Sequence, residues 1–239
     1  MITKYRKGRE SVPVKNRKKT VTPDASHTQI AYEGIKQILF TNEISPGRKI
    51  SYRQLADRLG MSLTPIIQAL KHLEFQGIVR YEPNKGYSTE PMSIQEVQEI
   101  YDMRELIEVS LLPDVIANLN EDGIKNLRVL LHTGEKSDEE SYLNECLLKD
   151  KEFHLTLASL SRRKIQEQML RYLFDLLYLK YRAGLLFIQS EDPVGSQHRN
   201  IFDAVVSHDA EEACKAMKAH FVKIKYQALK SLGRMMADK

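Results

Sequence analysis

Residues 51–90 read SYRQLADRLGMSLTPIIQALKHLEFQGIVRYEPNKGYSTE, and this stretch decides the fold of the N-terminal part of the chain. Ser51 and Gln54 have the spacing of a capping box that begins a helix, and Gly60 is placed to end that helix. Ser62 then caps a second helix of similar length. Two short helices joined by a tight turn that contains glycine are typical of a helix-turn-helix motif.

A β-hairpin is expected directly after the second helix. Gly77 ends that helix, and residues 78–81 have the apolar and β-branched character of a strand. Residues 83–86 form a turn, and residues 87–89 form the returning strand. A hairpin at this place is the wing of a winged helix-turn-helix, and residues 90–92 are its natural linker to the next domain.

The rest of the chain predicts a mainly α protein with two folded domains. Residues 1–26 are a basic, flexible tail, and a first helix over about 28–40 completes the three helices of a winged domain that spans 27–90. The remaining domain, 93–234, is predicted to be an all-α antiparallel helical bundle. Its amphipathic segments are 94–119, 121–134, 141–160, 164–189, 195–208 and 210–233. Ser93 with Glu96 forms another capping box, and Pro113 is expected to kink or split the first segment.

Charge is divided unevenly between the two domains. Up to residue 91 there are 16 Lys and Arg residues against 8 Asp and Glu, a net charge of +8, whereas the remainder has 20 against 24, a net charge of −4. The N-terminal part is therefore the one expected to contact a polyanion. Cys146 and Cys214 have no disulfide-framework or zinc-ribbon spacing, which fits a reducing cytoplasm. No leading apolar segment and no run long enough to span a bilayer is found, so no membrane partner is expected.

The residues expected to face double-stranded DNA lie on the two helices and on the wing. Polar side chains at the start of the second helix can donate to phosphates or base edges, and cations on the flanks and wing can contact phosphates. These residues are Arg53, Ser62, Leu63, Thr64, Gln68, Arg80, Lys85 and Gly86. The alternative for each cation is a solvated surface charge, and for the whole arrangement a winged helix that makes only protein contacts.

Four polar residues of the second domain lie where helical periodicity demands apolar ones. They are Asp150, His154, His198 and His220. Burying them without partners would cost several kcal/mol, and a shared divalent cation removes that penalty. A lone inward histidine is more often a hydrogen-bonded core residue, but four together favour a metal. Imidazole with one carboxylate suits Zn, Ni, Fe or Mn.

Arg104 also lies on an inward-facing series of the first bundle helix. One interpretation is a buried ion pair with Glu108, one helical turn away. The other is a guanidinium that binds the carboxylate of a ligand through two parallel hydrogen bonds.

These motifs resemble the GntR family of bacterial regulators, in its FadR-like branch with an FCD ligand-binding domain. The N-terminal resemblance rests on residues 44–50, 54–56, 62–65, 69–74, 77–79 and 83–87; the C-terminal resemblance rests on residues 104–108, 150–154, 197–205 and 219–221. The resemblance implies metal ligands at the same four positions, a DNA contact at Arg53, organic-acid effectors near Arg104 and a homodimer. The chain departs from the family pattern in having Leu63 and Ile67 where arginines are usual, Ser161-Arg162 where Gly-Asn is usual, and Gln197 where glutamate is common.

The sequence therefore predicts a homodimeric transcription regulator that binds a short inverted repeat and responds to a small organic acid at a metal site. The alternative is a metal-dependent hydrolase with an appended winged helix, because three histidines and an aspartate can leave a position open for water. Against the hydrolase, no carboxylate is clearly placed on the inward stripes as a free general base.

Overall fold

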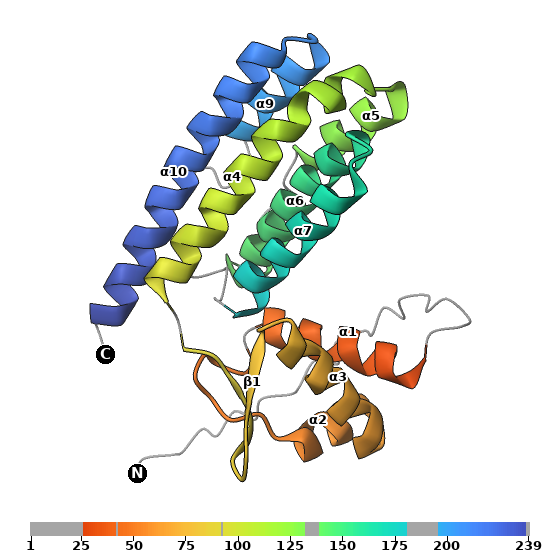
Figure 1. Cartoon of the computed structure of the whole chain (residues 1–239), viewed down its shortest axis with the longest axis vertical. Helices are drawn as coiled ribbons and strands as arrows, with labels where there is room; N and C mark the ends of the chain where they lie inside the picture. Colours follow the sequence, from red (N-terminus) through yellow and green to blue (C-terminus); the bar gives the residue numbers. More distant parts are fainter. Residues whose placement is uncertain (1–25, 42, 92, 132–138, 181–195, 238–239) are drawn as a thin grey trace, which may run out of the picture.

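The computed structural model describes residues 26–41, 43–91, 93–131, 139–180 and 196–237, and it is mainly helical, as predicted. Three short helices and a hairpin form the lower part of the molecule in Figure 1, and a bundle of longer helices stands above them. Most of the predicted tail, residues 1–25, lies outside the described residues, as do the predicted helical residues 132–134 and 181–189. Within the described ranges, none of the helices combines the length and hydropathy needed to cross a membrane.

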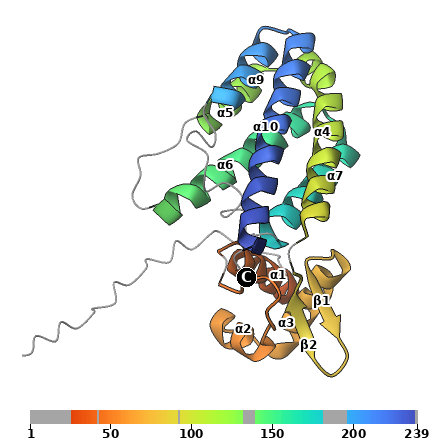
Figure 2. The same cartoon turned by 90° about the vertical axis from the view of Figure 1, so that its left-hand side faces the viewer.

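The N-terminal part is a winged helix-turn-helix. Its elements are α1 (His27–Phe40), α2 (Tyr52–Leu59), α3 (Leu63–Phe75), β1 (Val79–Glu82) and β2 (Gly86–Thr89). The two strands pair antiparallel, with Val79 opposite Thr89 and Glu82 opposite Gly86. Figure 2 shows this hairpin projecting beside α3.

The predicted helix boundaries of this part are confirmed with one exception. The Ser51 hydroxyl accepts a hydrogen bond from the Gln54 N–H, and Gly60 ends α2 with φ of 63°. Such a left-handed residue is a common helix terminator, and glycine adopts the conformation without steric cost. Ser62 occupies the N-cap position of α3, but its side chain makes no capping hydrogen bond. Its hydroxyl is exposed on the surface at the start of α3.

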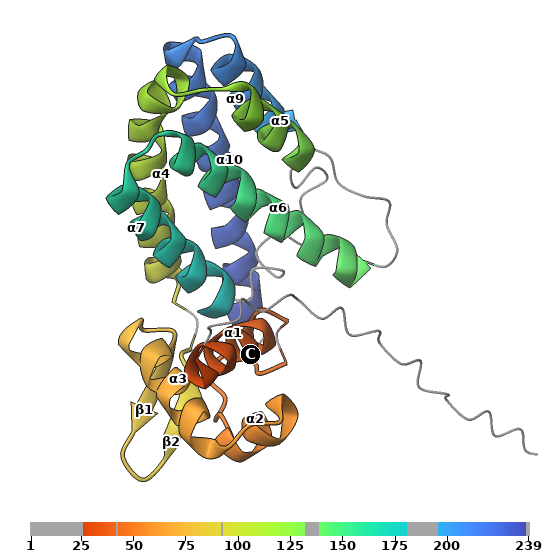
Figure 3. The same cartoon turned by 90° about the vertical axis from the view of Figure 1, so that its right-hand side faces the viewer.

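The C-terminal part is an all-helical bundle. Its elements are α4 (Ile94–Ala117), α5 (Glu121–Leu130), α6 (Glu139–Leu160), α7 (Lys164–Asp175), η1 (Leu176–Lys180), α9 (Ser196–Val206) and α10 (Ala210–Ala237). Helices α4 and α10 lie side by side along much of their length (Figures 1 and 2). Helices α6 and α7 cover another side of the bundle (Figure 3).

Two predictions about the bundle helices need correction. Helix α4 continues through Pro113, so a split at this residue is wrong and only the predicted kink remains as a prediction. The missing N–H of Pro113 leaves the Val109 carbonyl without its helical donor, and the Cys214 thiol donates to that carbonyl at 3.8 Å. The predicted segment 164–189 is not one continuous α-helix, because the π-helical turn η1 follows α7 at Leu176.

Charged contacts join the two parts of the molecule. Lys36 of α1 binds Asp175 at the end of α7, with Nζ 2.6 Å from Oδ2. Lys151 of α6 binds the other oxygen of Asp175 at 2.8 Å. All three side chains are at least three-quarters buried, so solvent screens these pairs less than it screens exposed ones.

Candidate functional site

The four polar residues that interrupt the apolar stripes of the bundle converge on one point. Asp150 and His154 lie one turn apart on α6, His198 lies on α9 and His220 lies on α10. Each residue is at most 2% exposed, and each offers one ligand atom within 4.8 Å of the others. Three helices thus bring one carboxylate and three imidazoles together in the core.

The nitrogen and oxygen atoms of this cluster lie within hydrogen-bond distance of one another. Nε2 of His198 is 3.2 Å from Nε2 of His154 and 3.3 Å from Oδ1 of Asp150. Among the described residues, Nε2 of His220 has no hydrogen-bond partner although it is buried. A buried ring nitrogen without a partner costs free energy, and a cation at the centre would satisfy it. The four residues therefore fit a divalent metal of the kind that binds imidazole and carboxylate ligands.

A set of outer residues fixes the orientation of the candidate ligands. Oε2 of Glu108 on α4 forms an ion-pair contact with Nδ1 of His154, and Gln197 accepts from Nδ1 of His220 through Oε1 at 3.0 Å. With Nδ1 engaged in this way, each ring presents Nε2 to the cluster, as is usual for histidine ligands.

Asp150 is oriented by a tyrosine from the π-helical turn. The Tyr178 hydroxyl donates to Oδ2 of Asp150 at 2.5 Å, which leaves Oδ1 directed at the histidines. Burial by itself raises the pKa of Asp150, but hydrogen bonds from His154 and His198 outweigh it, so the pKa lies well below its usual value. Burial and the neighbouring His198 and His154 rings lower the pKa of His220 well below its usual value. An ionised aspartate and a neutral histidine are the forms that bind a metal.

Arg104 is completely buried beside this cluster. Its Nε donates to Oε1 of Glu108 at 2.9 Å, and its guanidinium carbon lies 3.9 Å from the centre of the Phe174 ring. Among the described residues, Nη1 and Nη2 have no hydrogen-bond partner. The ion pair with Glu108 thus uses one edge of the guanidinium and leaves the two terminal nitrogens available for a ligand. The buried Tyr101 hydroxyl also lacks a partner among the described residues.

The residues predicted to face DNA lie at the surface of the winged helix. Arg53 is exposed on α2, and the beginning of α3 exposes Leu63 (41%) and the side chains around it. The Gln68 side chain accepts a hydrogen bond from the Thr28 hydroxyl at 2.6 Å, which ties α3 to α1. The other predicted contact residues at this end, Ser62 and Thr64, are exposed as well.

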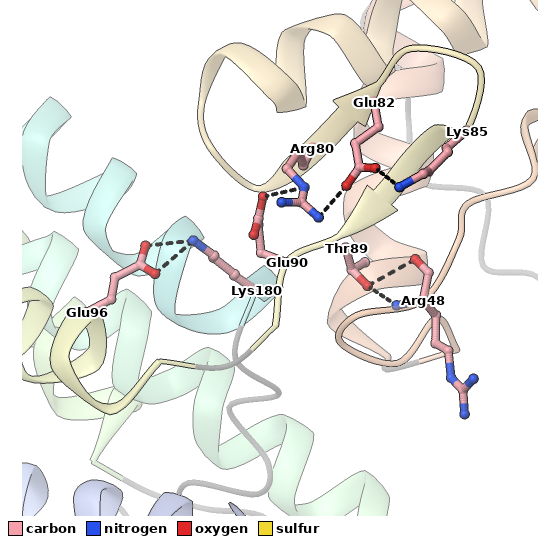
Figure 4. A network of polar contacts seen from close by, with 8 residues as sticks. All are labelled: Arg48, Arg80, Glu82, Lys85, Thr89, Glu90, Glu96 and Lys180. Carbon is pink, nitrogen blue, oxygen red and sulfur yellow. Dashed lines mark hydrogen bonds and ion pairs between the residues drawn. The ribbon is translucent and has the colours of Figure 1, made fainter.

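The cations of the wing are already engaged in ion pairs (Figure 4). Glu82 binds Arg80 at 2.5 Å and Lys85 at 2.7 Å, and Arg80 also lies 3.5 Å from Glu90. Gly86 follows Lys85 with φ of 85°, in the conformation that favours glycine. A phosphate contact by either cation would therefore have to compete with a carboxylate of the wing itself.

Three residues of the site could not be assigned from the sequence. The sequence indicates Glu108 only as a partner of Arg104, and its second contact, with His154, crosses between helices. Gln197 stands out in the sequence only as a departure from a family pattern. Tyr178 reaches Asp150 from the π-helical turn, for which the amphipathic pattern gives no signal.

Known protein families match both parts of the chain. The family model described as "Bacterial regulatory proteins, gntR family" matches residues 28–88, and the model described as "FCD domain" matches residues 99–223. The chain is 26% identical over 191 residues to the uncharacterized HTH-type transcriptional regulator YdhC of Bacillus subtilis, covering 80% of this chain and 85% of that one. It is 25% identical over 199 residues to the HTH-type transcriptional repressor GlaR of Escherichia coli, covering 80% of this chain and 90% of GlaR. The solved structure of E. coli McbR/YncC superposes with a TM-score of 0.72 at 20% identity, covering 89% of this chain and 100% of that one, and so supports the fold.

Proposed function

Since the chain belongs to the GntR family of bacterial regulatory proteins and carries an FCD domain, it is a DNA-binding transcription regulator, and we propose that a small carboxylate at a metal site controls its binding to operator DNA. The membership also removes the hydrolase alternative, because the family consists of transcription regulators and not of enzymes. One observation carries the proposal: four buried ligand atoms and two unpaired guanidinium nitrogens lie in the same part of the bundle core.

The metal would be held by Asp150, His154, His198 and His220. This set of donor atoms suits Zn, Ni, Fe or Mn. A bound divalent cation would supply a fixed positive charge and open positions for a ligand oxygen. Glu108 and Gln197 keep the two histidines in the required tautomer, and Tyr178 orients the aspartate.

Arg104 would bind the carboxylate of the effector. A guanidinium offers two parallel N–H groups to a carboxylate, and the Nη1 and Nη2 atoms are the ones that remain unpaired. Because Arg104 is anchored by Glu108 and by the Phe174 ring, it is held ready and loses little conformational freedom on binding.

The DNA-binding surface would consist of Arg53, Ser62, Leu63, Thr64, Gln68, Arg80, Lys85 and Gly86, with the beginning of α3 in the major groove. A two-fold dimer of the chain would read a short inverted repeat, since the symmetry of the site mirrors that of the protein. A regulator of bacterial DNA would act in the cytoplasm.

The charged contacts between the two parts give a physical route for control. Lys151 follows the candidate ligand Asp150 on α6, and it shares Asp175 with Lys36 of α1. Tyr178, which holds Asp150, belongs to η1, and η1 packs against α1. Among the described residues, η1 and Asp175 therefore connect the ligand site to the winged helix through direct contacts.

Two measurements on the full chain test this function. Native mass spectrometry of the protein as purified reports metal, bound acid and dimer together, and selection of genomic fragments reports the operator. We expect one metal per chain, a dimer and an enriched inverted repeat whose binding changes with the acid that was identified. No enriched sequence, or an unchanged affinity with and without that acid, would refute the proposal.

His198→Ala separates the two parts of the proposed function. We expect it to lose the metal and the response to the acid while still binding the selected DNA, because His198 lies on α9 and belongs to none of the elements of the winged helix. Full metal occupancy in this variant would show that the ligand set is assigned wrongly.

A further inference from the structure

Gln197 lies between the candidate metal site and a surface groove. Its Oε1 is 3.0 Å from Nδ1 of His220, and both residues line a groove of about 750 Å³ between α9 and α10. Gln197 is partly exposed to this groove, whereas His220 is 2% exposed. A substitution at Gln197 therefore reaches a candidate ligand without disturbing the centre of the core.

The two histidines with known outer partners differ in the charge of those partners. His154 faces the carboxylate of Glu108, whereas His220 faces the neutral amide of Gln197. A carboxylate behind a histidine makes that ligand more basic and strengthens metal binding, and an amide orients the ring without adding negative charge.

We propose that Gln197 is a positioning residue that sets the balance between metal affinity and anion affinity at this site. Its amide fixes Nε2 of His220 toward the cluster while keeping the surroundings of the metal positive enough to take an anion. The inference rests on the proposed function, since it assumes a divalent metal at the four ligands.

The buried charges of the described residues give the reason. Arg104 is positive, and Glu108 and Asp150 are negative; these are the fully buried charged side chains next to the ligand cluster. A divalent cation brings this set to a net charge of +1, which one carboxylate neutralises. Glutamate at position 197 would cancel that charge before any anion binds, and because this position is only partly exposed, solvent screens the added charge less than it screens a fully exposed one.

The test uses cobalt(II) as the metal and acetate as the anion, both followed by the visible absorption of cobalt in the full chain. In Gln197→Glu we expect cobalt affinity to rise about tenfold and acetate affinity to fall about tenfold, because one added charge attracts the cation and repels the anion. If Gln197 only maintained the structure, Gln197→Glu would change the affinities for cobalt and for acetate in the same direction.

Two further variants are matched controls. Asn200→Asp makes the same amide-to-carboxylate change in the same groove, at an exposed residue that makes no hydrogen bond to His220 among the described residues, and we expect less than a twofold change in either affinity. Gln197→Leu removes the hydrogen bond and adds no charge, and we expect cobalt affinity to fall about tenfold as His220 loses its orientation.

The outcomes distinguish this inference from the proposed function. Cobalt that fails to bind the wild-type chain would overturn both. Cobalt and acetate that bind the wild type, with either affinity unchanged in Gln197→Glu or with equal effects in Asn200→Asp, would overturn only the role of Gln197.

Discussion

Removing the metal is the most direct perturbation of the candidate site, and it should destabilise the bundle. Without a cation, Nε2 of His220 stays buried without a hydrogen bond among the described residues, whereas Oδ1 of Asp150 still has Nε2 of His198 at 3.3 Å. An unsatisfied buried nitrogen of this kind costs about 1–3 kcal/mol. Independently, a metal at a hundred times its Kd stabilises the folded state by about 2.7 kcal/mol.

The two magnitudes agree, and they translate into a measurable change of Tm. For a domain of this size, 1 kcal/mol shifts the Tm by roughly 2–4 °C, so chelation should lower the Tm by about 5–11 °C. The assay is differential scanning calorimetry of the full chain, first with EDTA and then with Zn²⁺ restored. Repeating it near pH 5 should reduce the effect of Zn²⁺, because protons compete with the metal for the histidines.

Two variants show whether the shift belongs to this site. His198→Ala should lose the response to Zn²⁺, because it removes one of the four ligands. His208→Asn should keep the full response: His208 is exposed, lies outside the cluster and has a φ of 58°, a conformation that asparagine tolerates. An unchanged Tm after chelation of a metal-loaded wild type, or an equal rise with Zn²⁺ in His198→Ala, would refute the reasoning.

Four further predictions concern DNA, the effector and the link between the two parts. Arg53→Ala should weaken operator binding by a similar factor on every sequence and reduce the slope of log K against log salt by about one, as measured by fluorescence anisotropy; an unchanged slope would remove Arg53 from the interface. Leu63→Arg should change the preferred half-site in a selection experiment, because a guanidinium reads guanine; an identical site would show that Leu63 does not face the bases. Arg104→Ala should keep the metal but weaken binding of the effector acid about tenfold or more in calorimetric titration, and an unaltered affinity would contradict the clamp. Lys36→Met should reduce the effect of that acid on DNA affinity more than Arg58→Met, since Arg58 forms an ion pair with Glu43 inside the winged helix; equal effects would exclude the Asp175 contact as the link.

The winged helix could be predicted almost completely because its signals are local. Capping at Ser51, the left-handed Gly60 and the turn before Gly86 each depend on a few neighbouring residues, and the structure confirms them. The absent capping bond of Ser62 is the exception. Backbone capping positions follow from the helix itself, whereas the side-chain rotamer also depends on surroundings that a sequence pattern does not describe.

The candidate metal cluster could be predicted for a different reason, namely that helical periodicity exposes polar residues on apolar stripes. The same reasoning could not find Glu108 as a partner of His154, because that contact joins α4 to α6 and depends on how the helices pack. It also could not foresee that Glu82 pairs with both cations of the wing, since charge counting treats each cation as free.

The π-helical turn explains how the bundle places a tyrosine on the candidate ligand Asp150. A π-helix has a wider turn than an α-helix, so the residues of η1 are rotated relative to the continuation of α7. Phe174 still packs in line with α7 over the guanidinium of Arg104, while Tyr178, one turn later, donates to Asp150. The end of α7 therefore contacts the guanidinium of the proposed effector site, and η1 directly after it contacts the candidate carboxylate ligand. Because η1 also packs against α1 of the winged helix, an effector that shifts Arg104 and Asp150 relative to each other would act on α7 and η1 first and on the DNA-binding part next.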